Sequence, residues 1–207
     1  MGIVVSGVPD LYLASQSLRR RELLRQIGVR HTVISATIPE QPAAGESARD
    51  YVQRLAREKA AAGYARVLEQ GLPEAPVLGA DTLGVIDGEI LEKPLDQAHA
   101  QRMLRQLSGR THQVLTAVAM HSSLQQSLRL SITDVTFRNL ADAEIAAYWS
   151  TGEPQDKAGS YAIQGLGAVF VKEIRGSYSA VVGLPVEATL ELLQAFGVPW
   201  WSDGVEV

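Results

Sequence analysis

The chain of 207 residues contains no cysteine. This absence excludes a disulfide framework, a zinc ribbon and a cysteine nucleophile, and nothing in the composition indicates an oxidising compartment. Residues 1–10 lack the charged start, apolar stretch and cleavage site of a secretory signal, and the sequence has no run of about 18 apolar residues. We therefore expect a cytoplasmic protein without a membrane partner.

A broad positive surface is also absent. The 23 acidic residues outnumber the 19 lysines and arginines, which leaves a net charge of -4, and aromatic residues make up only 6% of the chain. Nucleic-acid binding needs a basic surface and often stacking aromatics, so we expect no nucleic-acid partner. Any phosphate that this protein binds must be held by a local cluster of cations.

Several common catalytic motifs are missing. The sequence has no GxxxxGK(S/T) loop, no complete GxGxxG, no HExxH and no GxSxG. These absences argue against a P-loop, a Rossmann dinucleotide site, a zinc protease and an α/β-hydrolase. No two of the four histidines have i, i+4 spacing, so a histidine-built metal site has little support.

A chain of this length buries a core that needs no covalent staples. The length predicts one domain, or one domain with two lobes. Near the C-terminus, Trp200 and Trp201 are expected to pack back onto the domain, and a role in an interface is the alternative.

Hydrophobic periodicity and turn residues predict strands that alternate with helices. The expected strands cover 11–14, 31–36, 77–91 with a hairpin turn at Asp87-Gly88, 112–121, 128–137 and 168–172. The expected helices begin at the N-caps Ser17, Ser47, Asp96 and Asp142, and a last helix covers 185–196. Residues 151–165 are predicted to form a long polar loop. This order predicts an α/β fold with a mixed twisted sheet and flanking helices.

The segment SQSLRRRELL, residues 15–24, joins the first strand to the first helix. Its hydroxyls, its guanidiniums and the free N–H groups of a helix N-terminus together suit a phosphate; the residues concerned are Ser15, Ser17, Arg19 and Arg20. In the alternative interpretation Ser17 only caps the helix and the arginines only solvate it. Composition alone favours neither interpretation.

Asp81 follows an apolar strand, with Thr82 after it. A carboxylate at a strand end is where α/β sheets place groups that face a ligand, and it can bind a divalent cation or accept a proton from water. The alternative is an aspartate that caps a turn. The chain also has only four lysines, and Lys59, Lys93 and Lys157 lie in compact polar contexts that would suit contacts to a phosphate.

The ordered motifs SxSxRRxxLL, IPEQ, RLAREKA, GADT, EKP, LSGxTHxVxTAVA, TDVTF, GEPxDKAGxYxIQG and GSYxxVVGLP resemble the Maf family of nucleoside triphosphate pyrophosphatases over roughly residues 11–197. The branch that they resemble most acts on dTTP and UTP. The resemblance implies a two-lobed domain over residues 11–197, with an N-terminal extension, 1–10, before it and a C-terminal tail, 198–207, after it. It implies a nucleotide-binding cleft between the two lobes and cleavage of a nucleoside triphosphate into the monophosphate and pyrophosphate. It also implies a divalent cation, Mg²⁺ or Mn²⁺, a cytoplasmic location and, in many members, a homodimer.

Carried over by motif, Asp81 takes the position of the family's proton acceptor. Base-selecting positions fall on Arg19, Thr82 and Gln164. Positions around the triphosphate and the metal fall on Ser15, Ser17, Arg20, Glu40, Lys59 and Lys93, with Asp81 and Glu40 as the implied metal ligands. Leu18 departs from the family, which commonly has proline there; this change should loosen the helix start slightly without removing a donor.

Two other functions remain open at this point. A nucleotide-sensing module that regulates cell division or septum formation through a protein partner would keep the anion cluster without needing Asp81 as a base. A purine-directed relative is the other alternative, and Thr82 and Gln164 argue against it because they match the thymine and uracil pattern.

Overall fold

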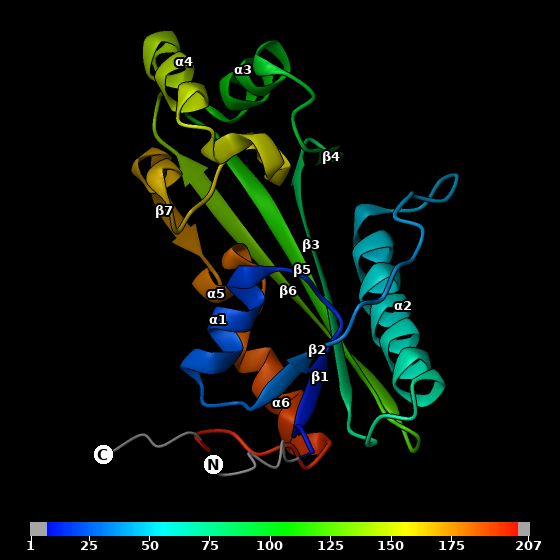
Figure 1. Cartoon of the computed structure of the whole chain (residues 1–207). Coiled ribbons are helices and arrows are strands. Elements are labelled where there is room, and N and C mark those ends of the chain that lie inside the picture. Colours follow the sequence, from blue (N-terminus) through cyan, green and yellow to red (C-terminus); the bar gives the residue numbers. More distant parts are fainter. Residues whose placement is uncertain (1–7, 203–207) are drawn as a thin grey trace.

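The computed structural model describes residues 8–202. Within these residues a seven-stranded mixed sheet has the order β2-β1-β3-β5-β6-β7, and β4 pairs with β3 outside this path (Figure 1). β1 runs parallel to β2 and β3, and the other pairs are antiparallel. The strands are β1 (Leu11–Leu13), β2 (His31–Val33), β3 (Val77–Ile86), β4 (Glu89–Leu91), β5 (Thr111–His121), β6 (Gln126–Phe137) and β7 (Val171–Arg175).

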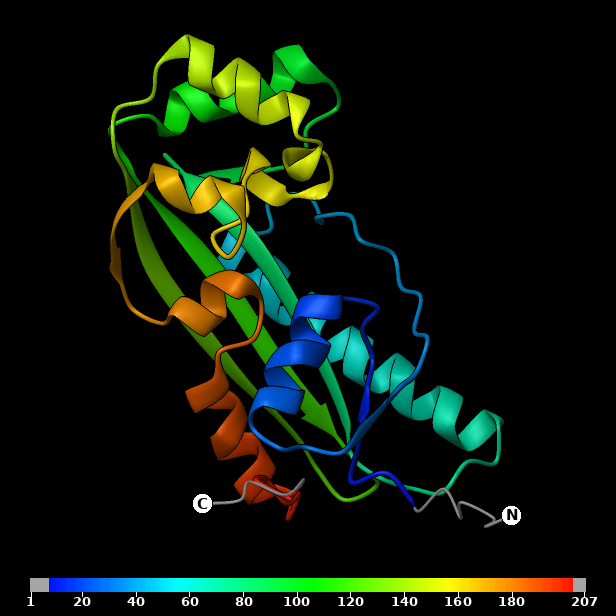
Figure 2. The same ribbon diagram turned by 60° about the vertical axis from the view of Figure 1, so that its left-hand side comes forward.

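Helices cover both faces of this sheet. They are α1 (Leu18–Gln26), α2 (Ala48–Glu69), α3 (Gln97–Leu107), α4 (Asp142–Ser150), α5 (Tyr178–Val182) and α6 (Val186–Ala195), with 3-10 helices η1 (Glu153–Asp156), η2 (Ala158–Ser160) and η3 (Leu166–Phe170). α2 lies on one face, and α1, α5 and α6 lie on the other (Figure 1). α3, α4 and the 3-10 helices gather at one end of the long strands (Figure 2). The mixed α/β fold is therefore confirmed.

Local capping chemistry explains why several elements begin where they do. The side chains of Ser17, Ser47 and Asp96 accept hydrogen bonds from main-chain N–H groups three residues later, as expected of N-caps. Asp87 and Gly88 both have positive φ, +53° and +82°, and connect β3 to β4 as the two-residue turn that the sequence predicts.

Other expectations were wrong in detail. The N-cap of α4 is Ala141, not Asp142, and the Glu144 carboxylate accepts the Ala141 N–H at 2.7 Å. Residues 151–165 contain 3-10 turns rather than a continuous loop, and the following strand begins only at Val171 because the 3-10 helix η3 occupies 166–170. The short helix α5 was not predicted, and β2 ends at Val33, three residues early.

The described part of the C-terminal tail, residues 198–202, packs back against the residues that follow α1. The N–H groups of Trp201 and Ser202 donate to the carbonyls of Ile27 and Gly28 at 2.8 and 3.0 Å. Trp200 packs against the core as expected, whereas the Trp201 side chain is 70% exposed. The expected N-terminal extension and tail lie outside the described residues at 1–7 and 203–207.

Candidate active site

The site is built around an open edge of β3. β1 pairs with this strand at Val77 and Leu78, β4 pairs with it from Gly84, and no described strand pairs with residues 79–83 on that side. Leu78 directs its carbonyl toward this edge, where it accepts the Ala14 N–H at 2.8 Å. Alternate residues of a strand turn their main-chain groups to the same edge, so the N–H and C=O groups of residues 80 and 82 also face the opening.

Side chains along this open segment alternate between the two faces of the sheet. Asp81 points toward α2, where Lys59 donates to its Oδ1 at 2.7 Å. Thr82 points to the opposite face, where it accepts from Arg20 of α1 at 3.2 Å. Adjacent residues of β3 therefore serve two polar groups that lie on opposite sides of one strand.

The group on the α2 face consists of one ammonium between two carboxylates. Lys59 Nζ lies 2.7 Å from Asp81 Oδ1 and 2.8 Å from Glu40 Oε1. The Lys59 and Asp81 side chains are only 11% and 14% exposed, whereas Glu40, on the loop before α2, is 57% exposed. The lysine thus holds a nearly buried carboxylate and an accessible one at the same place.

The group on the opposite face is organised by Arg20. Its Nε donates to the carbonyl of Gly183 at 2.8 Å, and Nη1 donates to Ser15 Oγ at 3.1 Å. Together with the bond to Thr82, these contacts use three of the five N–H groups of a guanidinium. Burial lowers the pKa of Arg20, while the charges of Asp81 and Glu40 act in the opposite direction. Arg20 therefore does not solvate the helix surface; it turns inward and keeps two N–H groups for other acceptors.

Both serines of the SxSxRR motif stabilise the turn between β1 and α1. Ser15 Oγ accepts the N–H of Ser17 at 3.2 Å, and Ser17 caps α1. Behind Thr82, the hydroxyl of Thr116 lies 3.0 Å from the threonine hydroxyl and donates to the carbonyl of Ala180 at 2.7 Å. The polar end of the site is thereby fixed to α1, β5 and α5.

A cleft of about 870 Å³ opens on the face that carries Arg20 and Thr82, a size within the usual range for small-molecule sites. Of the predicted site residues, its lining includes Ser17, Arg19, Arg20, Thr82, Lys93 and Gln164. Ser15, Glu40, Lys59 and Asp81 do not line it. The structure thus brings the predicted residues together as two groups rather than one, with the open edge of β3 between them.

Glu153 is a residue of this cleft that the sequence analysis did not single out. Its carboxylate accepts the N–H groups of Leu166 and Gly167 at 2.8 and 2.9 Å and the hydroxyl of Tyr148 at 2.6 Å. Burial raises the pKa of Glu153, but these hydrogen bonds outweigh burial and lower it. Glu153 therefore fixes the turn that follows Gln164. Glu153 lies in the motif GEPQDKAG, and this position is the sequence signal that could have identified it.

Two further residues of the lining were either missed or left without a role. His112, on β5, is buried, and its Nε2 lies 2.8 Å from the Tyr161 hydroxyl. Lys157, noted in the sequence for its polar context, forms an ion pair with the neighbouring Asp156 at the cleft.

The donor set near Lys59 suits a hard divalent cation. Within residues 8–202 no three histidine, cysteine or acidic side chains form a cluster that could hold a metal by themselves. Mg²⁺ typically takes one or two carboxylates, several waters and substrate phosphates rather than an all-protein cage. Asp81 and Glu40, which both pair with the Lys59 ammonium, fit that requirement.

The Maf-like protein family profile matches residues 10–196, so the chain belongs to this family. A dTTP/UTP pyrophosphatase from Saccharophagus degradans is 57% identical over 194 residues, which cover 94% of this chain and 92% of the relative. A dTTP/UTP pyrophosphatase from Escherichia coli O157:H7 is 57% identical over 187 residues, with 90% and 93% covered. A nucleoside triphosphate pyrophosphatase from Shigella flexneri is 56% identical over 187 residues, again with 90% and 93% covered.

No helix among the described residues is both long and apolar enough to span a membrane.

Proposed function

We propose that this protein hydrolyses dTTP and UTP to the monophosphate and pyrophosphate. The observation that carries the proposal is the pairing of Lys59 with Asp81 and Glu40 beside the open edge of β3, across that edge from Arg20 and Thr82. The names of relatives that match more than nine-tenths of their own length support the same reaction.

The triphosphate is proposed to lie across the open edge. The N-terminus of α1 supplies N–H groups and a favourable dipole, and Arg20 has two N–H groups beyond those it uses internally. Arg19 and Lys93 add positive charge in the cleft lining. Fixed cations of this kind stabilise the charge that develops as the pyrophosphate leaves.

Asp81 is proposed to accept the proton of the attacking water. The water oxygen bonds to the α-phosphorus, the bond from that phosphorus to the bridging oxygen of pyrophosphate breaks, and the water proton passes to the carboxylate. Lys59 holds Asp81 Oδ1 at 2.7 Å, which leaves Oδ2 as the oxygen free to take the proton. Positioned general-base catalysis contributes about 10² to 10⁴ in rate.

The cofactor in this proposal is Mg²⁺ or Mn²⁺, held by the carboxylates of Asp81 and Glu40. Such a cation supplies charge neutralisation at the phosphate oxygens and lowers the pKa of water. Lys59 keeps the two carboxylates together when no cation is bound.

Base selection is assigned to Gln164, with Arg19 and Thr82 in supporting positions in the cleft. An amide offers a donor and an acceptor, which match the O4 and N3–H groups shared by thymine and uracil. Cytosine would place its amino donor against the amide donor. The proposal also places the enzyme in the cytoplasm, in keeping with the lack of cysteine.

The test uses Asp81→Asn with Asp87→Asn as a matched control in the turn that follows the same strand. Asn tolerates the positive φ of position 87, and the ion pair with Arg110 that this change removes is solvent-exposed and contributes little, so we expect the control to keep the fold. We expect Asp81→Asn to lose at least about 100-fold in kcat for dTTP while still binding it, and the control to turn over normally. In ¹⁸O-water the label should appear in the monophosphate.

Three outcomes would contradict the proposal. Normal turnover by folded Asp81→Asn would show that Asp81 is not the proton acceptor. Label in the pyrophosphate would mean that water attacks the β-phosphorus. Tight nucleotide binding without any hydrolysis by the wild-type protein would favour the nucleotide-sensing module instead.

A further inference from the structure

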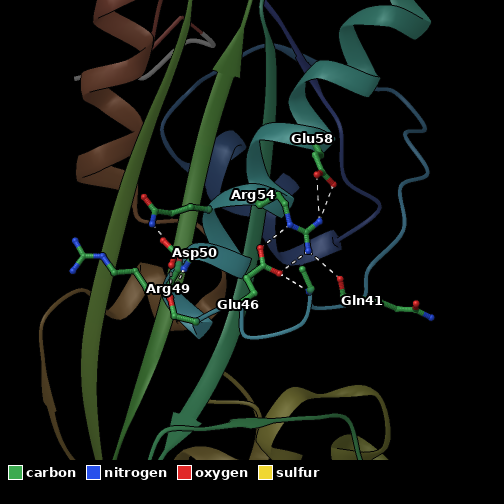
Figure 3. Close-up of polar contacts among 9 residues, drawn as sticks. Gln41, Glu46, Arg49, Asp50, Arg54 and Glu58 are labelled. Carbon is green, nitrogen blue, oxygen red and sulfur yellow. Dashed lines mark hydrogen bonds and ion pairs between the residues drawn. The ribbon is translucent and has the colours of Figure 1, made fainter.

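The loop between β2 and α2, residues 34–47, contains Glu40 but no helix or strand. Arg54 of α2 contacts this loop at two points (Figure 3). Its Nε and Nη2 donate to the two carboxylate oxygens of Glu46 at 2.7 and 2.8 Å, and Nη2 also donates to the main-chain carbonyl of Gln41 at 2.9 Å. One guanidinium therefore ties both ends of the segment 41–46 to the helix.

Further hydrogen bonds hold the Arg54–Glu46 pair in place. Nη1 of Arg54 donates to both oxygens of Glu58, one turn further along α2, at 3.2 Å. The Glu46 carboxylate also accepts the N–H of Ala43 at 2.9 Å. The hydrogen bonds from Arg54 and then from Ala43 lower the pKa of Glu46 to about 2, so this carboxylate stays ionised near neutral pH. Bidentate pairs of this kind fix geometry as well as charge.

Few contacts among the described residues hold the side chain of Glu40. It is 57% exposed and pairs with Lys59 at 2.8 Å. A single ion pair with one exposed partner contributes little to stability and does not by itself hold a long side chain in one geometry. The neighbouring carbonyl of Gln41, by contrast, is bound to Arg54 on the same helix that carries Lys59.

We propose that Arg54 is a positioning residue that fixes the main chain beside Glu40 and thereby keeps the Glu40 carboxylate against Lys59 and Asp81. The inference rests on the proposed function only in taking Glu40 and Asp81 to serve the hydrolysis. A displacement of about 1 Å in a reacting group can lower a rate by about 100-fold, so loosening this loop should be visible in kcat.

The first arm of the test measures hydrogen exchange in the whole protein. Arg54→Gln and Glu46→Gln each remove one partner of the Arg54–Glu46 ion pair, referred to below as the clamp. Arg66→Gln is the matched control, because Arg66 pairs with Glu69 near the other end of α2. We expect exchange within residues 40–46 to become faster by on the order of tenfold in both clamp variants and to stay unchanged in the control. Unchanged exchange in the loop of Glu46→Gln would overturn the proposal even if Arg54→Gln fails to fold.

The second arm is a double-mutant cycle in kcat with dTTP. Arg54→Gln should lose about 10- to 100-fold, and Arg54→Lys, which keeps the charge but not the fork, should recover part of that loss. If Arg54 acts through Glu40, the double variant Arg54→Gln/Glu40→Gln should lie within about twofold of Glu40→Gln alone.

The outcomes separate this inference from the proposed function. Losses that multiply in the double variant, or full activity of Arg54→Gln or Glu40→Gln, would overturn the positioning role. A wild-type protein that hydrolyses no nucleoside triphosphate would instead refute the proposed function, and the exchange arm would still decide whether Arg54 holds the loop.

Discussion

Replacing His112 with phenylalanine should remove a defined part of the acid sensitivity of the fold. His112 is only 2% exposed, and its ring packs edge-on against Phe137 and Tyr161. Its Nε2 lies 2.8 Å from the Tyr161 hydroxyl, and its buried Nδ1 has no hydrogen-bond partner within residues 8–202. Burial lowers the pKa of this histidine to about 4.

The size of the effect follows from the difference between the folded and unfolded pKa values. The ordinary histidine value is about 6.5, and a difference of about 2.5 units at about 1.4 kcal/mol per unit corresponds to about 3 kcal/mol. The folded pKa is the lower one, so protons bind the unfolded chain more readily. The contribution of neutral His112 is therefore fully present above about pH 6.5 and is lost as the pH falls toward 4.

Urea unfolding of wild type and His112→Phe at a series of pH values between about 7.5 and 4.5 measures this contribution. The variant leaves the Tyr161 hydroxyl without its partner at every pH, so that cost is a constant offset. We expect the free energy of unfolding of the variant to gain on wild type by about 2 to 3 kcal/mol across the range. A difference that stays constant with pH would refute the reasoning.

Three further outcomes are expected. Gln164→Ala should narrow the preference for dTTP over CTP more than it slows dTTP, since an unpaired polar group costs about 1 to 3 kcal/mol; equal slowing of dTTP, UTP and CTP in kcat/KM would contradict base selection. Gly79→Ala should lower the free energy of unfolding in urea by about 1 to 3 kcal/mol, because its Cβ would lie 2.5 Å from the carbonyl oxygen of Ala56 on α2. Leu18→Pro should raise the free energy of unfolding by about 0.4 to 1 kcal/mol, because residue 18 is the exposed first position of α1 and Ser17 already has extended φ and ψ. A lower melting temperature of this variant would contradict the prediction.

Elements that depend on chemistry within a few residues were predicted well. Ser17, Ser47 and Asp96 cap helices through bonds to N–H groups three residues away, and such bonds are visible in the sequence as spacing. The Asp87-Gly88 turn likewise depends on the two residues that form it. Tertiary contacts did not need to be known in these cases.

Elements that depend on distant contacts were predicted poorly. The 3-10 turns of residues 151–170 are held by Glu153 with Tyr148, and by the N–H of Gly159, which donates to the carbonyl of Glu92 at 3.1 Å. Composition indicated only that the segment is polar. The cap of α4 was misplaced by one residue for a related reason: Glu144 supplies the acceptor from inside the helix, so Ala141 needs no polar side chain.

The candidate site was predicted residue by residue but not in its geometry. Motifs selected Asp81, Lys59 and Glu40, and the structure places both carboxylates in contact with the Lys59 ammonium. One of the three acceptors that Arg20 binds within the protein is the carbonyl of Gly183, 163 positions away. This contact follows from tertiary packing, and no pattern in the sequence predicts it. The anchoring role of Arg54 was missed because its partners in the loop have no regular spacing from it.

The division of the site follows from the period of a strand. Because Asp81 and Thr82 are adjacent in β3, their side chains must point to opposite faces, and one ligand can reach both only where the strand has no neighbour. The early end of β1 at Leu13 and the late start of the pairing with β4 at Gly84 create that opening. In the proposed function the opening lets the phosphates pass between the base-selecting face and the hydrolytic face, so a strand paired along residues 79–83 would separate the two halves of the reaction even with every side chain in place.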